Sequence, residues 1–281
     1  MSYCPLSNWE APILEGGTLY ISYGKDSLAC LGACEYLGWK INRIVHAEVW
    51  ATDTIPAELP PMIEFKKKAD RIIKERYGLD VEHCRADVTY EDCFYSIFNS
   101  GKNKGQIYGW PFMRGPWCNS RLKLGAFAKC KANGVEYIGI AADEIARFKT
   151  LTAAKFSPLK VIGWEEDYCG LWCKYSDLLA PDYTDSYRGG CWFCHNQGVD
   201  QLRLLRKNYP EYWELLLKWD KDSPVTFKAD GHTVHDYDKR FRYEDEGIVP
   251  TDRTFRWSML DEPLQISFFG GLFNGSKHTA N

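Results

Sequence analysis

A strand, a short polar turn and a helix follow one another directly near the start of this 281-residue chain. Residues 18–21 are largely apolar, residues 22–27 read Ser-Tyr-Gly-Lys-Asp-Ser, and apolar residues then recur at helical spacing until Gly38. Such a turn presents the N–H groups of a helix amino end, together with the Lys25 ammonium, to one small anion. The segment therefore predicts a phosphate-binding turn and a bound nucleotide.

Residues 22–27 differ from a Walker A loop, which has its first glycine six residues before the lysine and a hydroxyl side chain directly after the lysine. Here those positions hold Leu19 and Asp26. The hexapeptide instead resembles the PP-loop of the adenine nucleotide alpha hydrolases, usually Ser-Gly-Gly-Lys-Asp-Ser, with Tyr23 in place of a glycine. That resemblance implies cleavage of ATP between the α and β phosphates, or binding of a sulfated adenylate. The alternative is a plain polar turn in which Ser22 caps the helix.

The composition is that of an ordinary soluble globular protein, with 45% apolar and 26% charged residues. A formal net charge of -3 provides no global attraction to nucleic acid or to an anionic membrane. No apolar stretch approaches the length of a membrane span. The first residues also do not show the basic segment followed by an apolar run that is typical of an export signal. The sequence predicts a cytoplasmic protein with no membrane partner.

Strands and helices alternate through the first half of the chain. Apolar runs predict strands at residues 18–21, 44–50, 81–84 and 135–141, and helical spacing predicts helices at 28–37, 62–77 and 119–133. This order predicts an α/β fold, a Rossmann-like parallel sheet with helices on both faces. Ligands of such sheets bind beyond the carboxyl ends of the strands, where the turn, Asp53, Asp143 and Glu144 all fall.

The pattern changes near residue 156 to short segments rich in Trp, Tyr, Asp and Gly. A single amphipathic helix is expected at about residues 200–220, interrupted at Pro210. We therefore predict a nucleotide-binding domain at residues 1–155 and a small cysteine- and aromatic-rich C-terminal lobe at residues 156–281.

Eleven cysteines in a cytoplasmic chain indicate core packing, metal ligands or redox groups rather than disulfides. Two follow a glycine pair as Cys-x-x-Cys, and two more lie upstream; the predicted metal ligands are Cys118, Cys173, Cys191 and Cys194. Four thiolates suit tetrahedral zinc or a 4Fe-4S cluster. Cys169 and His195 are alternative fourth ligands, a thioredoxin-like redox pair is a competing function, and buried unliganded thiols are the structural alternative.

The other cysteines carry less information. Cys30 and Cys34 lie four residues apart on the predicted helix after the turn and are expected to face the core. Four more have no evident partner in the sequence, namely Cys4, Cys84, Cys93 and Cys130.

With these residues in view, the chain resembles the phosphoadenosine phosphosulfate (PAPS) reductase family in its broad sense, which includes phage- and plasmid-borne members and DNA phosphorothioation sulfurtransferases. The resemblance runs from about residue 20 to residue 197 and rests on five motifs in the family's order. They are the PP-loop, Asp53-Thr54 with Pro60-Pro61-Met62, Trp117-Cys118-Asn119-Ser120-Arg121-Leu122-Lys123, residues 139–144 with Arg147, and Arg188-Gly189-Gly190-Cys191-Trp192-Phe193-Cys194.

The resemblance implies roles for individual residues. The cofactor-binding set is Ser22, Tyr23, Gly24, Lys25, Asp26, Ser27, Asp53, Arg121, Lys123, Glu144 and Arg147, and the catalytic set is Lys25, Asp26 and Asp143. In this scheme the turn holds phosphate, the other cations add charge, and Asp53 or Asp143 helps to place Mg²⁺ or the nucleotide. Each role has a structural alternative. Arg121, Lys123 and Arg147 could simply be solvated on helix surfaces, and Asp143 with Glu144 could be a pair of charges at the start of a helix.

Two departures from the family pattern bear on the reaction. No cysteine follows Cys194, although the reductases carry one in a C-terminal Glu-Cys-Gly-like motif. Cys118 also stands alone, where the iron-sulfur reductases have an adjacent pair. The resemblance therefore favours an enzyme that uses ATP to adenylate a substrate for sulfur transfer, releasing pyrophosphate and AMP, over a thiol-dependent reductase of PAPS or its 3'-dephospho form.

A third function is a non-catalytic module that binds a nucleotide or a nucleic acid. The cations and aromatics of the segment 203–213 support it, although an amphipathic helix with inward aromatics explains them equally. For the enzyme, the acceptor is either nucleic acid or a small molecule, and the resemblance allows a separate sulfur donor, such as a cysteine desulfurase, and a homodimer.

Overall fold

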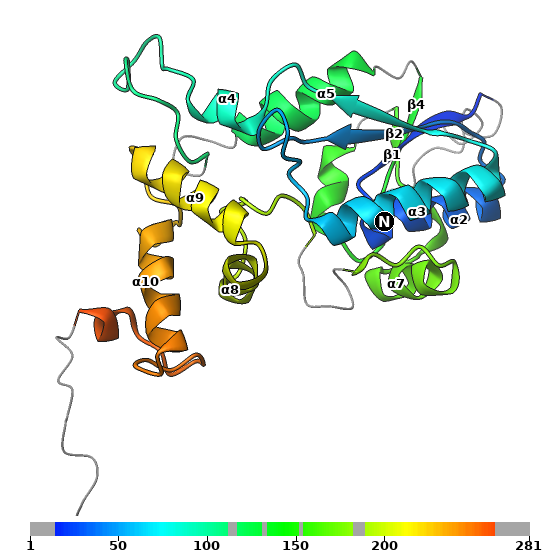
Figure 1. Ribbon diagram of the computed structural model, residues 1–281. Coiled ribbons are helices and arrows are strands. Elements are labelled where there is room, and N and C mark those ends of the chain that lie inside the picture. The colour runs from blue at the N-terminus through cyan, green and yellow to red at the C-terminus, as the bar shows by residue number, and fades with distance from the viewer. Residues whose placement is uncertain (1–14, 112–116, 131–133, 152–153, 182–188, 262–281) are drawn as a thin grey trace, which may run out of the picture. The chain divides into compact units, whose positions relative to one another are not determined.

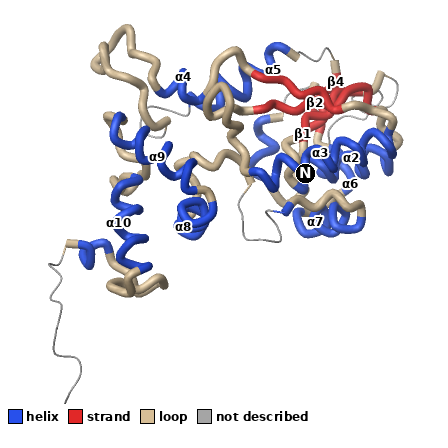
Figure 2. Tube along the Cα trace, viewed as in Figure 1, coloured by secondary structure: helices blue, strands red, loops and turns tan. Residues whose placement is uncertain are grey.

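The computed structural model describes residues 15–111, 117–130, 134–151, 154–181 and 189–261. Its centre is a five-stranded sheet in the order β3-β2-β1-β4-β5, and every neighbouring pair is parallel (Figures 1 and 2). The strands are β1 (Gly17–Ile21), β2 (Ile41–Glu48), β3 (Val81–Arg85), β4 (Val135–Ile138) and β5 (Lys155–Phe156). The predicted α/β fold with a parallel sheet is confirmed, and β5, too short for a sequence signal, adds an edge strand.

The helices that follow β1 and β2 end where the sequence predicts. Helix α2 (Lys25–Leu37) and helix α3 (Pro60–Tyr77) each stop at a glycine in the left-handed region, Gly38 at φ 66° and Gly78 at φ 70°. Glycine adopts this conformation without a Cβ clash, so it lets the chain turn away from the last helical carbonyls. Helix α3 begins at a proline pair, which is tolerated in the first helical turn because the N–H groups that proline lacks would have no helical partner there.

Each face of the sheet is covered by helices, as Figure 1 shows. Leu19 of β1 and Ile44 of β2 lie in one buried cluster with residues of α2, α3 and α7 (Glu166–Tyr175). The next residue along each strand, Tyr20 and Val45, belongs to a second cluster that includes Ala126 of α5 (Leu124–Lys129). Because side chains alternate across a strand, consecutive apolar residues produce a sheet buried on both sides.

None of the remaining described helices of this part of the chain is longer than α2. They are α4 (Tyr90–Phe94), the π-helical turn η2 (Asn119–Lys123), the 3-10 helix η3 (Ile145–Thr150), α6 (Pro158–Ile162), α8 (Val199–Asn208) and α9 (Pro210–Asp222). The helix predicted at 119–133 is present as η2 followed by α5, and residues 131–133 lie outside the described residues. The break predicted at Pro210 is confirmed, since it separates α8 from α9. Trp213 is buried, as expected for inward-facing aromatics.

One pair of cysteines without a partner in the sequence forms a disulfide. Cys84 on β3 is bonded to Cys130, which follows α5. The sequence indicated core packing, metal ligands or redox groups rather than a disulfide framework, and this pair departs from that pattern because packing of α5 on the sheet joins segments 46 residues apart. Cys30 and Cys34 are buried and free, as predicted, and Cys4 lies outside the described residues.

The chain forms two compact units, Met1–His232 and Thr233–Asn281. In the second, α10 (Val234–Asp245) starts with a capping box between Thr233 and Asp236, and the 3-10 helix η5 (Trp257–Leu260) closes the described chain. The sheet, β5 and the α6–α7 segment all belong to the first unit. The domain boundary at residue 155 stays a prediction.

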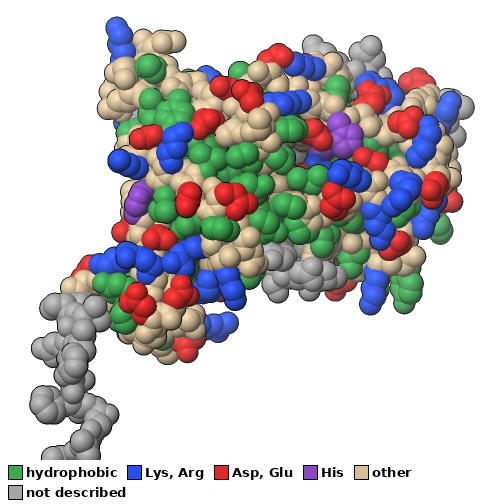
Figure 3. Space-filling view, viewed as in Figure 1, with side chains coloured by type: hydrophobic (Ala, Val, Ile, Leu, Met, Phe, Trp, Pro, Cys, Tyr) green, Lys and Arg blue, Asp and Glu red, His purple; other side chains and the backbone are tan. Residues whose placement is uncertain are grey.

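Charges of both signs are mixed on the face that Figure 3 shows, with hydrophobic side chains gathered between them. This agrees with the small net charge of -3, so contact with a polyanion depends on local groups. Among the described helices, none has both the length and the apolar character that crossing a membrane requires.

Candidate active site

The turn after β1 is held by its own hydroxyl groups. Ser27 Oγ donates to the Gly24 carbonyl oxygen at 2.9 Å and accepts from the Ser22 N–H at 3.0 Å. Gly24 is the cap residue directly before α2, and no side chain caps that helix end among the described residues. The alternative in which Ser22 is a helix cap is therefore wrong. The turn leaves the amino end of a 13-residue helix uncapped by side chains, which favours an anion there.

Lys25 is the first residue of α2, and its ammonium is held by two carboxylates. It donates to Asp26 at 2.9 Å and to Glu166 of α7 at 2.7 Å. Burial would lower the pKa of Lys25, but the hydrogen bonds to Glu166 and Asp26 outweigh it and raise the pKa above its ordinary value. Lys25 is therefore a permanent cation at the start of the helix, and a phosphate that binds it must displace part of this pairing.

The acidic residues after β4 lie beside this cluster. Asp143 Oδ1 accepts from the Glu166 N–H at 3.2 Å, and Glu144 accepts from the Ala141 N–H at 3.2 Å. Both carboxylate oxygens of Glu144 also accept hydrogen bonds from Arg147 Nη1, at 2.7 and 2.6 Å. Burial is the largest cause of the raised pKa of Asp26, and Lys25 opposes it. The structure thus gathers Lys25, Asp26 and Asp143 around Glu166.

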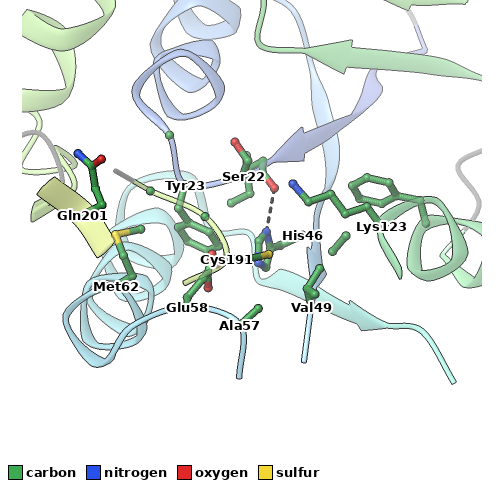
Figure 4. Close-up of a pocket in the computed structure, with 16 residues that line it drawn as sticks. Ser22, Tyr23, His46, Val49, Ala57, Glu58, Met62, Lys123, Cys191 and Gln201 are labelled. Carbon is green, nitrogen blue, oxygen red and sulfur yellow. Dashed lines mark hydrogen bonds between the residues drawn. The ribbon is translucent and has the colours of Figure 1, made fainter. Parts of the chain in front are cut away.

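A cavity of about 690 Å³ opens at the turn (Figure 4). Of the predicted site residues, it is lined by Ser22, Tyr23, Gly24, Lys123 and Cys191. In Figure 4 the Lys123 side chain extends toward Ser22 from one side, and Met62 and Gln201 lie on the other. The cavity therefore joins the predicted phosphate turn to one of the predicted metal ligands, although these are far apart in the sequence.

Two other residues that were predicted to bind the nucleotide, Asp53 and Arg121, contact residues away from the cavity. Asp53 is 93% exposed and lies 3.6 Å from Arg85 Nη2. Arg121 Nη2 donates to the Tyr108 hydroxyl at 2.7 Å, and its guanidinium lies over the Tyr108 ring. Neither residue lines the cavity. Their roles at a nucleotide stay predictions.

The loop that carries the Cys-x-x-Cys motif is fixed against the segment between β2 and α3. The Trp192 N–H donates to the Ala57 carbonyl at 2.8 Å, and Trp192 Nε1 donates to the Pro56 carbonyl at 2.9 Å. Gln197 Nε2 in turn donates to the Cys191 carbonyl at 3.0 Å. These bonds set Cys191 at the cavity wall. Arg188, the first residue of the motif, lies outside the described residues.

Three predicted metal ligands gather around Tyr90, the first residue of α4. Cys118, Cys191 and Cys194 all contribute, after burial, to a raised pKa of the Tyr90 hydroxyl. Burial likewise raises the pKa of Cys118, and it raises that of Cys191 to about 12, so both thiols are protonated without a metal. Across the described ranges no group of three or more His, Cys, Asp or Glu side chains is close enough to hold a metal ion. Metal binding thus requires the three sulfurs to draw together.

The hydroxyl of Tyr90 is an unsatisfied donor in this cluster. Its ring packs on Phe193 at 4.1 Å and on Trp117 at 4.9 Å, residues adjacent in the chain to the three cysteines. Tyr90 is 1% exposed, and neither its hydroxyl nor Trp117 Nε1 has a hydrogen-bond partner among the described residues. Leaving two buried donors unpaired is costly. Both donors are therefore available to hydrogen-bond a ligand that binds between the thiols.

Cys173 is separate from this group, which corrects the predicted set of four ligands. It lies on α7, and its thiol donates to the Lys25 carbonyl at 3.2 Å. Burial raises its pKa to about 12, and the nearest cysteine that contributes is Cys169. Both are fully buried in the core between α2 and α7. The reason is the helical packing of α7, which turns both cysteines toward α2.

Several residues of this site were not among those predicted from the sequence. Glu166 was assigned to a separate lobe, and an acidic helix start is an ordinary pattern. His46 interrupts an otherwise apolar strand, which was a usable signal; its Nδ1 donates to the Ile21 carbonyl at 3.0 Å, and burial lowers its pKa to about 3. Glu58 carried no signal, yet it lines the cavity and pairs with buried Lys66.

Gly139 permits the close approach of β4 to the turn, and its replacement provides a first test. A Cβ at this position would lie 2.6 Å from Ser27 N and Cα and 2.8 Å from the Asp26 carbonyl carbon. These are backbone atoms and cannot rotate away, so Gly139→Ala is expected to lower the free energy of unfolding by about 1 to 3 kcal/mol, measured by denaturant titration. Gly125→Ala is the control, because its nearest neighbour outside the helix is Ala86 Cβ at 3.7 Å. Equal stability of the two variants would contradict the close packing.

Comparison with known proteins shows limited similarity. No protein-family model matches the chain. It is 31% identical over 108 residues to "Uncharacterized nin region protein ORF290" of Escherichia phage lambda, and this match covers 36% of the chain and only 36% of the phage protein. The solved structure of the "U34-tRNA thiolase NcsA from Methanococcus maripaludis with its [4Fe-4S] cluster" superposes with a TM-score of 0.35 and 15% identity, over 79% of this chain and 80% of that one. So weak a superposition supports no statement about function.

Proposed function

We propose that the chain is an enzyme that binds ATP at the turn 22–27, adenylates an acceptor and prepares it for sulfur transfer. One observation supports this above all: a single cavity is lined by the turn, by Lys123 and by the Cys191 thiol. Phosphate-binding groups and a sulfur atom thus face the same space. At about 690 Å³, the cavity is within the usual size range of small-molecule sites.

In the proposed reaction, an acceptor oxygen attacks the α-phosphorus of ATP. The bond from that phosphorus to the bridging oxygen of the β-phosphate breaks, and pyrophosphate leaves with the electron pair. A sulfur nucleophile then displaces AMP from the adenylated acceptor carbon. Lys123 at the cavity wall and the amino end of α2, which begins with Lys25, stabilise the negative charge that develops on the leaving group, and this needs no protein nucleophile.

Magnesium fits the carboxylates beside the turn. Asp26 and Asp143 both lie around Glu166 and offer oxygen atoms, the ligands that this ion prefers. When bound with ATP, Mg²⁺ would supply further charge neutralisation on the phosphates. The protein residues meanwhile orient the nucleotide, and Glu166 of α7 holds the Lys25 ammonium until the phosphates bind.

A thiolate-bound metal centre at the cysteine group is the second part of the proposal, and it requires the three sulfurs to draw together. Cys118, Cys191 and Cys194 would hold it, with Tyr90 as a hydrogen-bond donor to its sulfur ligands. Three soft ligands suit an iron-sulfur cluster or zinc. When bound, such a centre would supply a site for a sulfur atom or a Lewis acid next to the cavity. Cys118 and Cys194 position Cys191, and the aromatic wall of Phe193 and Trp117 excludes water.

The test is to incubate the purified protein with Mg²⁺, ATP labelled in its α-phosphate, and either a mixed RNA pool or a set of small-molecule acceptors. The expected products are labelled AMP and pyrophosphate. Release of sulfite from a PAPS sample, without AMP from ATP, would replace the proposal with the reductase activity. Tight ATP binding without turnover under any condition would leave the non-catalytic module.

A further inference from the structure

Tyr23 has an unusual backbone in the predicted phosphate turn. Its φ is 58°, in the left-handed region that glycine occupies easily and tyrosine rarely does. The resembled turn has glycine here. A side chain at this position is thus unfavourable unless other contacts compensate, and the side chain of Tyr23 is completely buried.

The contacts that compensate come from α3 and β3. The Tyr23 hydroxyl donates to Asp70 and lies 3.2 Å from His83 Nε2. The same His83 nitrogen lies 2.9 Å from Asp70 Oδ2, and its Nδ1 lies 2.8 Å from Glu48. Tyr23, Asp70, His83 and Glu48 therefore form one hydrogen-bonded chain, which joins the turn to α3, β3 and the end of β2.

The ring of Tyr23 is fixed as well. It packs edge-on against His46 with ring centroids 4.8 Å apart, and the Lys66 ammonium lies 5.3 Å from its centroid. His46 Nε2 lies 2.7 Å from Lys66 Nζ, and Lys66 also pairs with Glu58 at the cavity. Since His46 Nδ1 donates to the Ile21 carbonyl, its Nε2 accepts from Lys66. The ring is thus held at the cavity wall, which His46 and Glu58 also line.

We propose that Tyr23 is a positioning residue, which keeps the nucleotide turn in its binding conformation through its bonds to Asp70 and His83. The inference rests on the proposed binding of ATP at this turn. An anchored tyrosine does here what a flexible glycine cannot, because it holds the backbone in one conformation before the nucleotide arrives, and a preformed site loses less entropy on binding.

The anchor depends on the charge of His83. The titratable groups around it are Asp70 from α3, Glu48 and His46 from β2, and Tyr23, with Lys66 and Glu58 behind them. Hydrogen bonds to Asp70 and then to Glu48 raise the pKa of His83 to about 9. Below that pH both ring nitrogens donate, one to each carboxylate. Above it one carboxylate loses its donor, so the anchor weakens as pH rises through about 9.

The test measures the Kd of MgATP by calorimetry for the full chain between pH 7 and pH 10. Tyr23→Phe is expected to raise the Kd about tenfold at pH 7, the scale of one lost hydrogen bond to a charged partner. The wild type is expected to lose affinity as the pH rises through about 9, and His83→Gln is expected to bind weakly with no such step. Tyr77→Phe is the matched control. Tyr77 is the last residue of α3, its hydroxyl is hydrogen-bonded to Glu35, and it does not line the cavity.

Two failures can be told apart. A wild type that does not bind MgATP would overturn the proposed function. A wild type that binds, with Tyr23→Phe and His83→Gln unchanged in affinity and in pH profile, would overturn the anchor alone. If Tyr23→Phe does not fold, His83→Gln decides by itself, since His83 is only partly buried and its replacement removes a donor without opening a cavity.

Discussion

Replacing Cys118, Cys191 or Cys194 by serine is expected to remove the metal from the protein, whereas Cys173→Ser is expected to retain it. The first three surround the unpaired Tyr90 hydroxyl, and the fourth donates to the Lys25 carbonyl in the core behind α2. Losing one of three thiolates leaves too few soft ligands for a stable site. Cys173 serves as the matched control, because it too is a free thiol.

The measurement is metal content after anaerobic purification, by elemental analysis for zinc and iron and by visible absorbance for a cluster. Wild type and Cys173→Ser should carry equal metal, and the other three variants essentially none. A wild type without zinc or iron would end the metal proposal. Loss of metal in Cys173→Ser at unchanged thermal stability would instead restore the four-cysteine set that the sequence predicted.

Lys25→Ala is expected to weaken ATP binding by roughly 1.5 to 3 kcal/mol, the scale of a charge-assisted hydrogen bond, and so raise Kd by about 10- to 150-fold. The physical reason is that Lys25 is a permanent cation at the start of α2. Titration calorimetry with MgATP measures the effect. Lys67→Ala is the control, because that side chain is 68% exposed and its ammonium pairs with Glu64 of the same helix.

Glu166→Gln separates two explanations of the Lys25 contacts. If Glu166 only competes with phosphate for the ammonium, its neutral replacement should leave the affinity unchanged or increase it. Weakening similar to that of Lys25→Ala would show that Glu166 binds Mg²⁺ or nucleotide instead. Unchanged affinity in Lys25→Ala itself would contradict phosphate binding at the turn.

Much of the fold was predictable because its signals are local. The apolar runs of β1 and β2, the proline start of α3 and the glycine stops at Gly38 and Gly78 depend on residues within one or two turns of each other. The two-residue strand β5 has no such signal, and it forms because β4 offers it an open edge. The same limit applies to the phosphate turn, where the sequence indicated the hydroxyls but not the conformation of Tyr23.

The strand-turn-helix unit, the helix ends and the parallel α/β architecture could be read from local residue patterns, since these follow from backbone geometry and apolar periodicity. Which distant side chains meet depended on tertiary packing. Glu166 contacts Lys25, which is 141 residues away in the chain. Cys173 lies apart from the other three cysteines, against the Lys25 carbonyl, and Cys84 forms a disulfide with Cys130. Spacing along the chain constrains neighbours within an element, whereas contacts between elements depend on how whole helices pack, which no short motif encodes.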